Sequence, residues 1–218
     1  GPAFFTDIPA GPLTTRHVAD IYAFPNTLCA LILSGAQLRD WLERAAAYFN
    51  RIVPGQPDQP LVNHDFPGHH FDVIEGLTYE IDLSVPSRYS SDGTAVQTHS
   101  RRIINLRHQG QPIDLKQDFI VATNNFRVFG GAPYAKAETA HAIFQSQTPV
   151  IDAVKQQLRA AGMGFEAPPV WSFRPMPGTS VVFDTGPGLR GHPQDIAALG
   201  LTDLGDTPEG FARFRMEL

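Results

Sequence analysis

Cysteine is nearly absent from this sequence, and long hydrophobic runs and an excess of basic charge are absent altogether. The single cysteine among 218 residues, Cys29, excludes an internal disulfide, and its place in the apolar run TLCALIL predicts a buried thiol. No window reaches the roughly 18 consecutive apolar residues of a membrane-spanning helix, so we expect no membrane partner. The formal net charge of -5 argues against a nucleic-acid partner held by phosphate neutralisation. The composition does not exclude the binding of small ligands.

The motifs of the common catalytic centres are also missing. There is no Gly-x-Ser-x-Gly nucleophile elbow, no P-loop and no Gly-x-Gly-x-x-Gly turn after a predicted strand, and the lone cysteine has no recognisable partner pattern. We therefore predict no catalytic residue in this chain, and no activity of the chain alone.

A histidine-rich stretch imitates part of a metal site. Asn63-His64-Asp65 and Gly68-His69-His70 look like pieces of the metallophosphoesterase signatures Gly-Asn-His-Asp/Glu and Gly-His-x-His. A two-metal site needs further ligands from other strand ends, including an early Asp-x-His, and nothing upstream supplies them. We expect no metal here and interpret His64, His69 and His70 as a solvated loop.

Hydrophobic periodicity predicts an α+β fold. Apolar runs that are continuous or alternate with polar residues predict strands at 27–33, 77–83, 102–107, 119–123, 180–183 and 210–216. Predicted helices are a short one after Thr14 or Thr15, one with an apolar face of Leu38, Trp41, Leu42, Ala45 and Phe49, one at 149–161 and a short one at 194–199. This order indicates a mixed β-sheet with packed helices. Because no repeat or long linker divides the chain, we treat 1–218 as a single domain.

Three segments lack periodicity. The segment 50–70 is rich in Pro, Gly, Asn, Asp and His, which predicts a long surface loop of the kind that often carries function. The polar segment 86–100 predicts a mobile excursion, and 163–180 is rich in Pro and Gly.

The stretch 118–134, DFIVATNNFRVFGGAPY, organises the rest. Its strand at 119–123 is apolar and β-branched, as in a buried strand, and Asn124 and Asn125 end it. Phe126, Arg127 and the tightly turning pair Gly130-Gly131 follow, so the loop can present a ring beside hydrogen-bonding groups, as a site for a flat, polar ligand requires. The alternative is an ordinary turn with Phe126 in the core.

A second ring precedes a strand in AFPNTL. Two rings can hold a nucleobase between them, each stack contributing about 1–3 kcal/mol, while asparagine amides bind the edge of the base. Phe24 and Phe126 are candidates for such a clamp. Core packing is the competing interpretation for each ring, and Asn26 is alternatively only a turn residue.

Several stretches of the sequence, taken together, resemble a known family. The strings GPLTTRHVADIYAFPNTLCALILSGAQLRDWLE, FDVIEGLTYEIDL, RIINLRHQGQPID, FIVATNNFRVFGG and the tail VVFDTGPG…EGFARFRMEL resemble the C-terminal domain of the 5'-nucleotidase superfamily. The likeness is closest to the bacterial 2',3'-cyclic-nucleotide 2'-phosphodiesterase/3'-nucleotidases. In that family the C-terminal domain holds a nucleoside between two rings, and an N-terminal metallophosphoesterase domain holds two divalent metal ions.

The resemblance implies site residues in this chain. The ring of the family motif FPNTL or YPNTL falls on Phe24, with Asn26 as its polar neighbour. The ring of NN(Y/F)R falls on Phe126, with Asn125 before it and Gly130-Gly131 after it. All six are expected to bind substrate.

The chain also departs from the family. Related 5'-nucleotidases have an Asp after the double glycine that helps to hold the ribose, and Ala132 stands there instead, which favours the cyclic phosphodiesterase branch. Asp72 and Arg127 are our candidates for the ribose role. The family domain normally begins with a helix and a strand upstream of Gly1, so we expect another segment or a second copy to cover the edge left there.

The resemblance implies one function and leaves alternatives. We expect the nucleotide-binding part of a periplasmic hydrolase that converts 2',3'-cyclic nucleotides to 3'-nucleotides and then removes the phosphate. Its ligands would be nucleosides, 3'-nucleotides and 2',3'-cyclic nucleotides, and it would need no cofactor of its own. Alternatives are a 5'-nucleotidase-type substrate domain and a non-enzymatic nucleoside-binding module. The first residues contain no secretion signal, which fits either a removed signal or a cytosolic protein.

Overall fold

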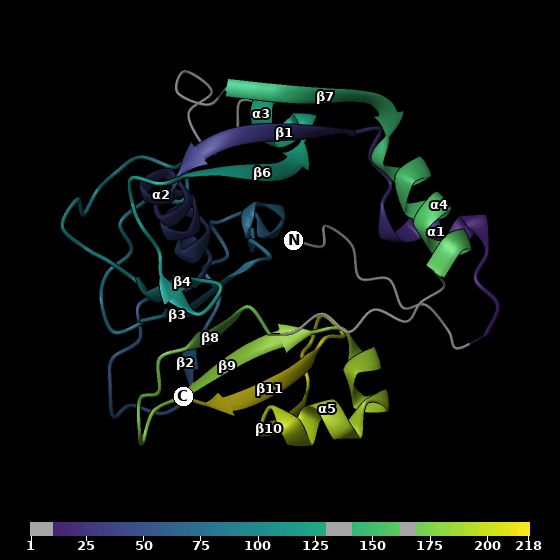
Figure 1. Cartoon of the computed structure of the whole chain (residues 1–218). Helices are drawn as coiled ribbons and strands as arrows, with labels where there is room; N and C mark the ends of the chain where they lie inside the picture. The colour runs from purple at the N-terminus through teal and green to yellow at the C-terminus, as the bar shows by residue number, and fades with distance from the viewer. Residues whose placement is uncertain (1–10, 130–140, 162–168) are drawn as a thin grey trace.

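The computed structural model of the protein describes residues 11–129, 141–161 and 169–218. Within these ranges the strands form three small sheets rather than one large one, and the helices lie at their faces and ends (Figure 1). Two of the sheets contain both antiparallel and parallel pairs. The predicted α+β class with mixed sheets is therefore confirmed.

The upper sheet of Figure 1 has β1 (Thr27–Ser34) at its centre, between β6 (Asp118–Asn124) and β7 (His141–Pro149). Both pairs are antiparallel, and the predicted strands at 27–33 and 119–123 are confirmed. The pattern of β7 carries no strand signal, because the polar run QSQT interrupts its apolar residues. Pairing with β1 makes it a strand.

The two faces of this sheet differ. Cys29, Leu31 and Leu33 of β1 point into the core and are at most 1% exposed, which confirms the buried thiol. The opposite side, which we call the outer apolar face, carries Leu28, Ile32, Ile120 and Phe144, and Ile120 is 73% exposed. The prediction of a buried strand at 119–123 was therefore wrong for this face, because β6 is an edge strand covered on one side only.

Helix α2 (Gly35–Ala45) begins directly where β1 ends. The Ser34 hydroxyl accepts the Gln37 backbone N–H at 3.3 Å, and the Gln37 side chain accepts the Ser34 N–H at 2.8 Å, which is a capping box. A side chain at Gly35 could not be placed, because its Cβ would lie 2.3 Å from the Asp114 carbonyl oxygen. The predicted apolar face is buried, although Phe49 lies beyond the helix, after the 3₁₀ turn η1 (Ala46–Tyr48).

The middle sheet has the strand order β5, β4, β3, β8. Its strands are β5 (Gln111–Pro112), β4 (Ile103–His108), β3 (Leu77–Ile81) and β8 (Trp171–Phe173). Burial alternates along β3 as predicted, and β4 is also confirmed. Gln109 (φ 51°) and Gly110 (φ 78°) form the two-residue turn of the β4–β5 hairpin, both in the left-handed region that primed turns require. β8, in the Pro- and Gly-rich segment, lacks a sequence signal.

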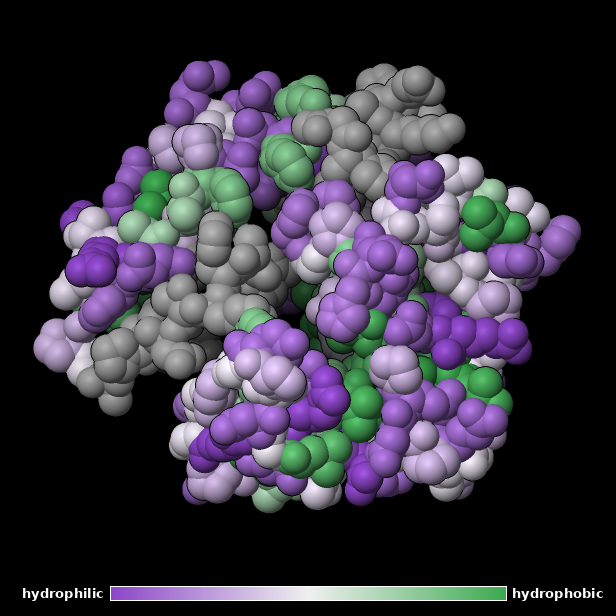
Figure 2. All heavy atoms as spheres, turned by 180° about the vertical axis from the view of Figure 1, so that it is seen from behind, coloured by the Kyte–Doolittle hydropathy of each residue, from purple (hydrophilic) through white to green (hydrophobic). Residues whose placement is uncertain are grey.

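The lower sheet, formed mainly by the C-terminal tail, has the order β10, β11, β9, β2. Its strands are β10 (Leu201–Asp206), β11 (Ala212–Glu217), β9 (Ser180–Thr185) and β2 (Gln59–Pro60), with η3 (Pro187–Gly191) and α5 (Pro193–Ala198) after β9. The predicted strands at 180–183 and 210–216 and the helix at 194–199 are confirmed, whereas β10 and β2 were not predicted. Seen from behind, hydrophobic residues occur in small groups among hydrophilic ones (Figure 2).

Two helices pack side by side at one end of the upper sheet, α1 (Thr15–Ile21) and α4 (Val150–Ala161) (Figure 1). Both were predicted, and Thr14 caps α1. The Val150 N–H donates to the Asn26 carbonyl oxygen at 2.7 Å, which ties the start of α4 to the start of β1. In the described part of the chain, none of the helices has the length and apolar character needed to cross a membrane.

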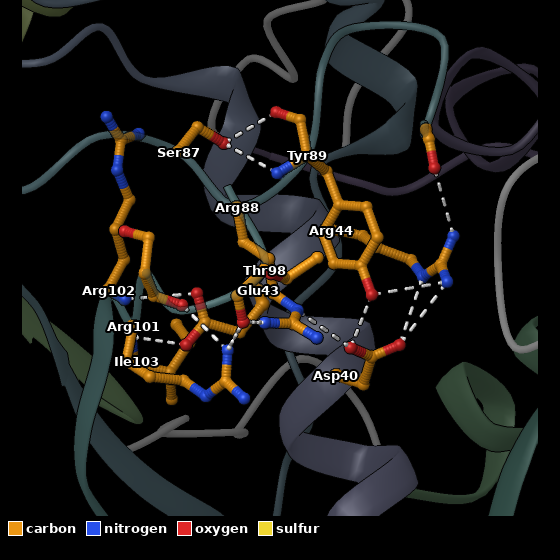
Figure 3. Close-up of polar contacts among 12 residues, drawn as sticks. Asp40, Glu43, Arg44, Ser87, Arg88, Tyr89, Thr98, Arg101, Arg102 and Ile103 are labelled. Atoms are coloured by element: carbon orange, nitrogen blue, oxygen red, sulfur yellow. Dashed lines mark hydrogen bonds and ion pairs between the residues drawn. The ribbon is translucent and has the colours of Figure 1, made fainter. Parts of the chain in front are cut away.

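Two of the three segments without periodicity, 50–70 and 86–100, are attached to the core. In 50–70, Leu61 and Phe66 are buried, and η2 (Gly68–His70) is a 3₁₀ turn. In 86–100, Tyr89 is buried, its hydroxyl donates to the Asp40 carboxylate of α2, and the Arg44 guanidinium lies 4.2 Å from its ring centroid (Figure 3). The expected mobile excursion is thus fixed to α2 at Tyr89.

Below this contact a charged pair is fully buried. Glu43 of α2 accepts the backbone N–H groups of Arg102 (3.0 Å) and Ile103 (3.2 Å), so the carboxylate holds the start of β4 (Figure 3). The Arg102 guanidinium donates to the carbonyl oxygens of Ala46 (2.9 Å) and Phe49 (2.7 Å). Both side chains belong to residues that are 1% exposed. Each charge is therefore solvated by the chain itself.

Candidate functional site

The candidate site lies where β1 begins and β6 ends. Because the two strands are antiparallel and Leu28 pairs with Asn124, the residues before β1 meet the residues after β6. Phe24 and Asn26 precede β1, and Asn125 and Phe126 begin the short helix α3 (Asn125–Phe129). The sequence predicted an irregular loop after Asn124, whereas the structure has one helical turn there.

The hydroxyl of Tyr22 joins the motif before β1, which contains Phe24 and Asn26, to the motif at the end of β6, which contains Asn124 to Phe126. It accepts the side-chain amide of Asn26 at 3.1 Å and that of Asn124 at 3.3 Å. A third bond crosses between the motifs, from the Thr27 N–H to the side-chain oxygen of Asn125 at 2.9 Å. Residues about 100 positions apart are thereby held together.

Tyr22 was not among the predicted site residues. The only sequence signal for it is its position two residues before Phe24, next to the motif that the resemblance identified. Asn124, predicted only to end the strand, has a further role, because its side-chain oxygen accepts the Arg127 backbone N–H at 2.9 Å and caps α3.

The two candidate rings have different surroundings. Phe24 is 48% exposed and meets Tyr22 edge to face, with ring centroids 6.4 Å apart. Phe126 is half-buried at the margin of the core, with the Arg127 guanidinium 5.4 Å from its ring centroid and the His69 ring 6.5 Å away. Phe24 is therefore the accessible ring, and Phe126 is the one supported by neighbouring groups.

Asp72 and Arg127, our candidates for the ribose, bind each other. Arg127 donates to one Asp72 oxygen from Nε at 3.0 Å and from Nη2 at 2.8 Å. The other Asp72 oxygen accepts the indole N–H of Trp41 at 2.9 Å, and Arg127 Nη2 also donates to the His69 carbonyl oxygen at 2.5 Å. The structure thus gives both residues protein partners beside Phe126.

The histidine stretch is only partly solvated. His64 is exposed, but His69 and His70 are half-buried, with ring centroids 4.2 Å apart. Burial, with the nearby Arg127 guanidinium, lowers the pKa of both imidazoles below their ordinary range, so they are neutral at pH 7. The expectation of a solvated loop was wrong for these two, because η2 places His69 against α3 and His70 against Phe66.

The described residues do not fit a two-metal centre. Among residues 11–129, 141–161 and 169–218, no three His, Cys, Asp or Glu side chains come together in a way that could hold a metal ion. Gly130 and Gly131, predicted to bind substrate, and Ala132 lie outside the described residues.

The sequence assigns the chain to a class of protein. Residues 1–139 match the sequence model of the family "5'-nucleotidase, C-terminal domain", so the chain belongs to this family. The resemblance stated above is confirmed.

Relatives of known name agree with this assignment. The trifunctional nucleotide phosphoesterase protein YfkN of Bacillus subtilis is 35% identical over 100% of this chain and 15% of its own length. The 2',3'-cyclic-nucleotide 2'-phosphodiesterase/3'-nucleotidase of Haemophilus influenzae is 33% identical over 100% of this chain and 35% of its own length. The chain therefore spans about a third or less of these curated relatives.

A solved structure shares the fold. A Staphylococcus aureus protein assigned as a 5'-nucleotidase superimposes with a TM-score of 0.57 and 29% identity, covering 74% of this chain and 29% of that chain. Relatives whose names describe phosphodiesterase and nucleotidase activity thus contain a domain like this one.

Proposed function

We propose that this chain is the nucleoside-binding domain of a hydrolase that opens 2',3'-cyclic nucleotides to 3'-nucleotides and then removes the 3'-phosphate. Two divalent metal ions, held by an N-terminal metallophosphoesterase domain of the same protein, would activate the attacking water there. We place the protein in the periplasm. The described residues of this chain would bind and orient the nucleoside.

One observation carries the proposal. The motif with Phe24 and the motif with Phe126 are joined through Tyr22, so two aromatic rings and asparagine side chains gather at one end of the upper sheet. A ring stacks on any nucleobase, and an amide donates to and accepts from its edge. Asn26 and Asn125 each use one end of the side-chain amide within these bonds, and the other end is suited to a ligand.

The test is calorimetric titration of the full-length protein with adenosine or 3'-AMP. Replacing Phe126 by alanine removes one stack and should weaken binding by about 1–3 kcal/mol. The matched control is Phe129→Ala, which removes a 60% exposed ring from the same short helix and should leave the affinity unchanged. Wild-type affinity in Phe126→Ala would refute the proposal.

The enzymatic part is tested separately. The full-length protein should release phosphate from 3'-AMP and open 2',3'-cyclic AMP with added manganese, cobalt or zinc, whereas residues 1–218 alone should do neither. The sequence that precedes residue 1 in the full-length protein should contain Asp-x-His and Gly-Asn-His-Asp/Glu. A full-length protein that binds adenosine but hydrolyses neither substrate would be a non-enzymatic binding module.

A further inference from the structure

Asp72 and Arg127 form a largely buried ion pair beside the candidate site. Their side chains are 15% and 12% exposed, and three N–H groups converge on the Asp72 carboxylate, two from Arg127 and one from Trp41. Trp41 belongs to α2 and is 4% exposed, so Asp72 is anchored in the core. The pair therefore connects α3 to α2 through Asp72.

A helix of five residues cannot hold its own position. Nucleation of a helical turn is unfavourable, and helices this short form only where other parts of the chain stabilise them. α3 is held by the Asn124 cap, by the bond from the Thr27 N–H to Asn125, by Val128 in the core, and by the Arg127 bonds to Asp72 and to the His69 carbonyl oxygen. Arg127 is adjacent to Phe126, and its guanidinium lies beside that ring.

We propose that Asp72 and Arg127 are positioning residues, which set the orientation of the Phe126 ring and do not contact the nucleoside. This inference rests on the proposed function, because it assumes that Phe126 stacks on the base. It replaces the ribose role that the sequence indicated. The reason is geometric. The Arg127 guanidinium donates to the Asp72 carboxylate, which also accepts the Trp41 indole N–H, and Arg127 also donates to the His69 carbonyl oxygen.

Conservative variants test the inference in the full-length protein. Asp72→Asn keeps the shape and removes the charge, Arg127→Lys keeps the charge and removes the two-pronged bond, and Trp41→Phe removes the indole N–H. Each should weaken adenosine binding by roughly 3- to 10-fold, within the coupling range of residues in contact. The control is Asp152→Asn, which breaks an exposed pair with Lys155 on α4 and should change nothing.

Two comparisons separate positioning from direct contact. A positioning residue acts through the stacked base, so its replacement should weaken adenine and adenosine equally, whereas a ribose ligand affects adenosine alone. In a Phe126→Ala background the three replacements should have no further effect on affinity, because the ring they orient is gone. Circular dichroism and melting temperature of each variant report folding independently.

Each outcome decides one claim. A loss with adenosine but not with adenine would overturn the inference in favour of a ribose contact. Additive losses in the Phe126→Ala background, or unchanged binding in all three folded variants while Phe126→Ala binds weakly, would also overturn it. Equal affinity of the wild type and Phe126→Ala would instead refute the proposed function.

Discussion

Two arginines attach other parts of the chain to helix α2, and they do so in different ways. Arg102 is 1% exposed, and its guanidinium donates to the carbonyl oxygens of Ala46 and Phe49, which follow α2, and of Val85. The Arg127 side chain is 12% exposed and donates to the Asp72 carboxylate, which in turn accepts from Trp41 of α2.

This difference predicts that Arg102 acts mainly on the stability of the fold and Arg127 mainly on ligand binding. The partners of Arg102 are backbone carbonyl groups, which every variant of the chain retains. We therefore assign Arg102 a role in the stability of the fold. Burial lowers the pKa of Arg102 to about 10, which still leaves it charged at pH 7. Arg127 has side-chain partners next to a ring of the candidate site, so its replacement should alter binding more than folding. The predictions below test this division.

Arg102→Met should have the largest effect on stability. It removes the guanidinium that donates to three carbonyl oxygens and one of the cations near the buried Glu43 carboxylate, which should cost about 3–5 kcal/mol of unfolding free energy. Urea denaturation measures it. Arg101→Met is the matched control, since Arg101 is exposed and donates only to carbonyl groups of its own loop. Similar stability of the two variants would contradict the role given to Arg102.

Tyr89→Phe should have a smaller effect, confined to one segment. It removes the hydroxyl that donates to Asp40 and accepts from Arg44 at 3.4 Å, at a cost of about 1–2 kcal/mol. Limited proteolysis should then cut within 86–100 faster than in the wild type. Val96→Ala, at a residue 53% exposed in the same segment, should not accelerate cleavage. Unchanged cleavage in Tyr89→Phe would show that the segment is held by other contacts.

The smallest predicted effect is on the pH dependence of stability, to which two buried carboxyl groups, Glu43 and Asp82, contribute with opposite signs. Burial raises the pKa of Glu43 above its ordinary 4.5, despite the bonds from Arg102 and Ile103. At Asp82 burial also acts to raise the pKa, but the bonds from Ser84 and Arg174 outweigh it and hold the pKa below 3.8.

The sign follows from linkage. The stability from Glu43 is fully present below pH 4.5 and is lost as the pH rises through its folded pKa, whereas the stability from Asp82 is present above pH 3.8 and is lost as the pH falls through its folded pKa. Urea titrations of Glu43→Gln and Asp82→Asn across the acid range should show the two differences from wild type moving in opposite directions. Parallel pH profiles would contradict the assignment.

The strands and helices with strong apolar patterns could be predicted, and the weak ones could not. The segments 27–33 and 149–161 carry their own signals of period and length. β7 and β10 are half polar and become strands only through pairing with β1 and β11. Their formation depends on long-range hydrogen bonds, which leave no local pattern.

The candidate site followed the same rule. Phe24, Asn26, Asn125 and Phe126 could be proposed from the sequence because they lie in two recognisable motifs, and their binding role stays a prediction. Tyr22 was missed because its bond to Asn124 joins residues 102 positions apart, and the partnership of Asp72 with Arg127 was invisible because 55 positions separate them. The sequence names groups able to bind a ligand, but only the fold shows which of them are already bound to each other.

The outer apolar face of the upper sheet has a consequence for the behaviour of this polypeptide in solution. Leu28, Ile32, Ile120 and Phe144 present side chains that are 37% to 73% exposed on neighbouring strands, and apolar surfaces of this kind adsorb amphiphilic molecules. Residues 1–218 in the native state should therefore make anilinonaphthalene sulfonate fluoresce, and adenosine should not displace the dye, since the nucleoside would bind at the end of the sheet rather than on its face. Ile120→Thr should reduce this native-state fluorescence, and it should also delay the clouding of concentrated solutions.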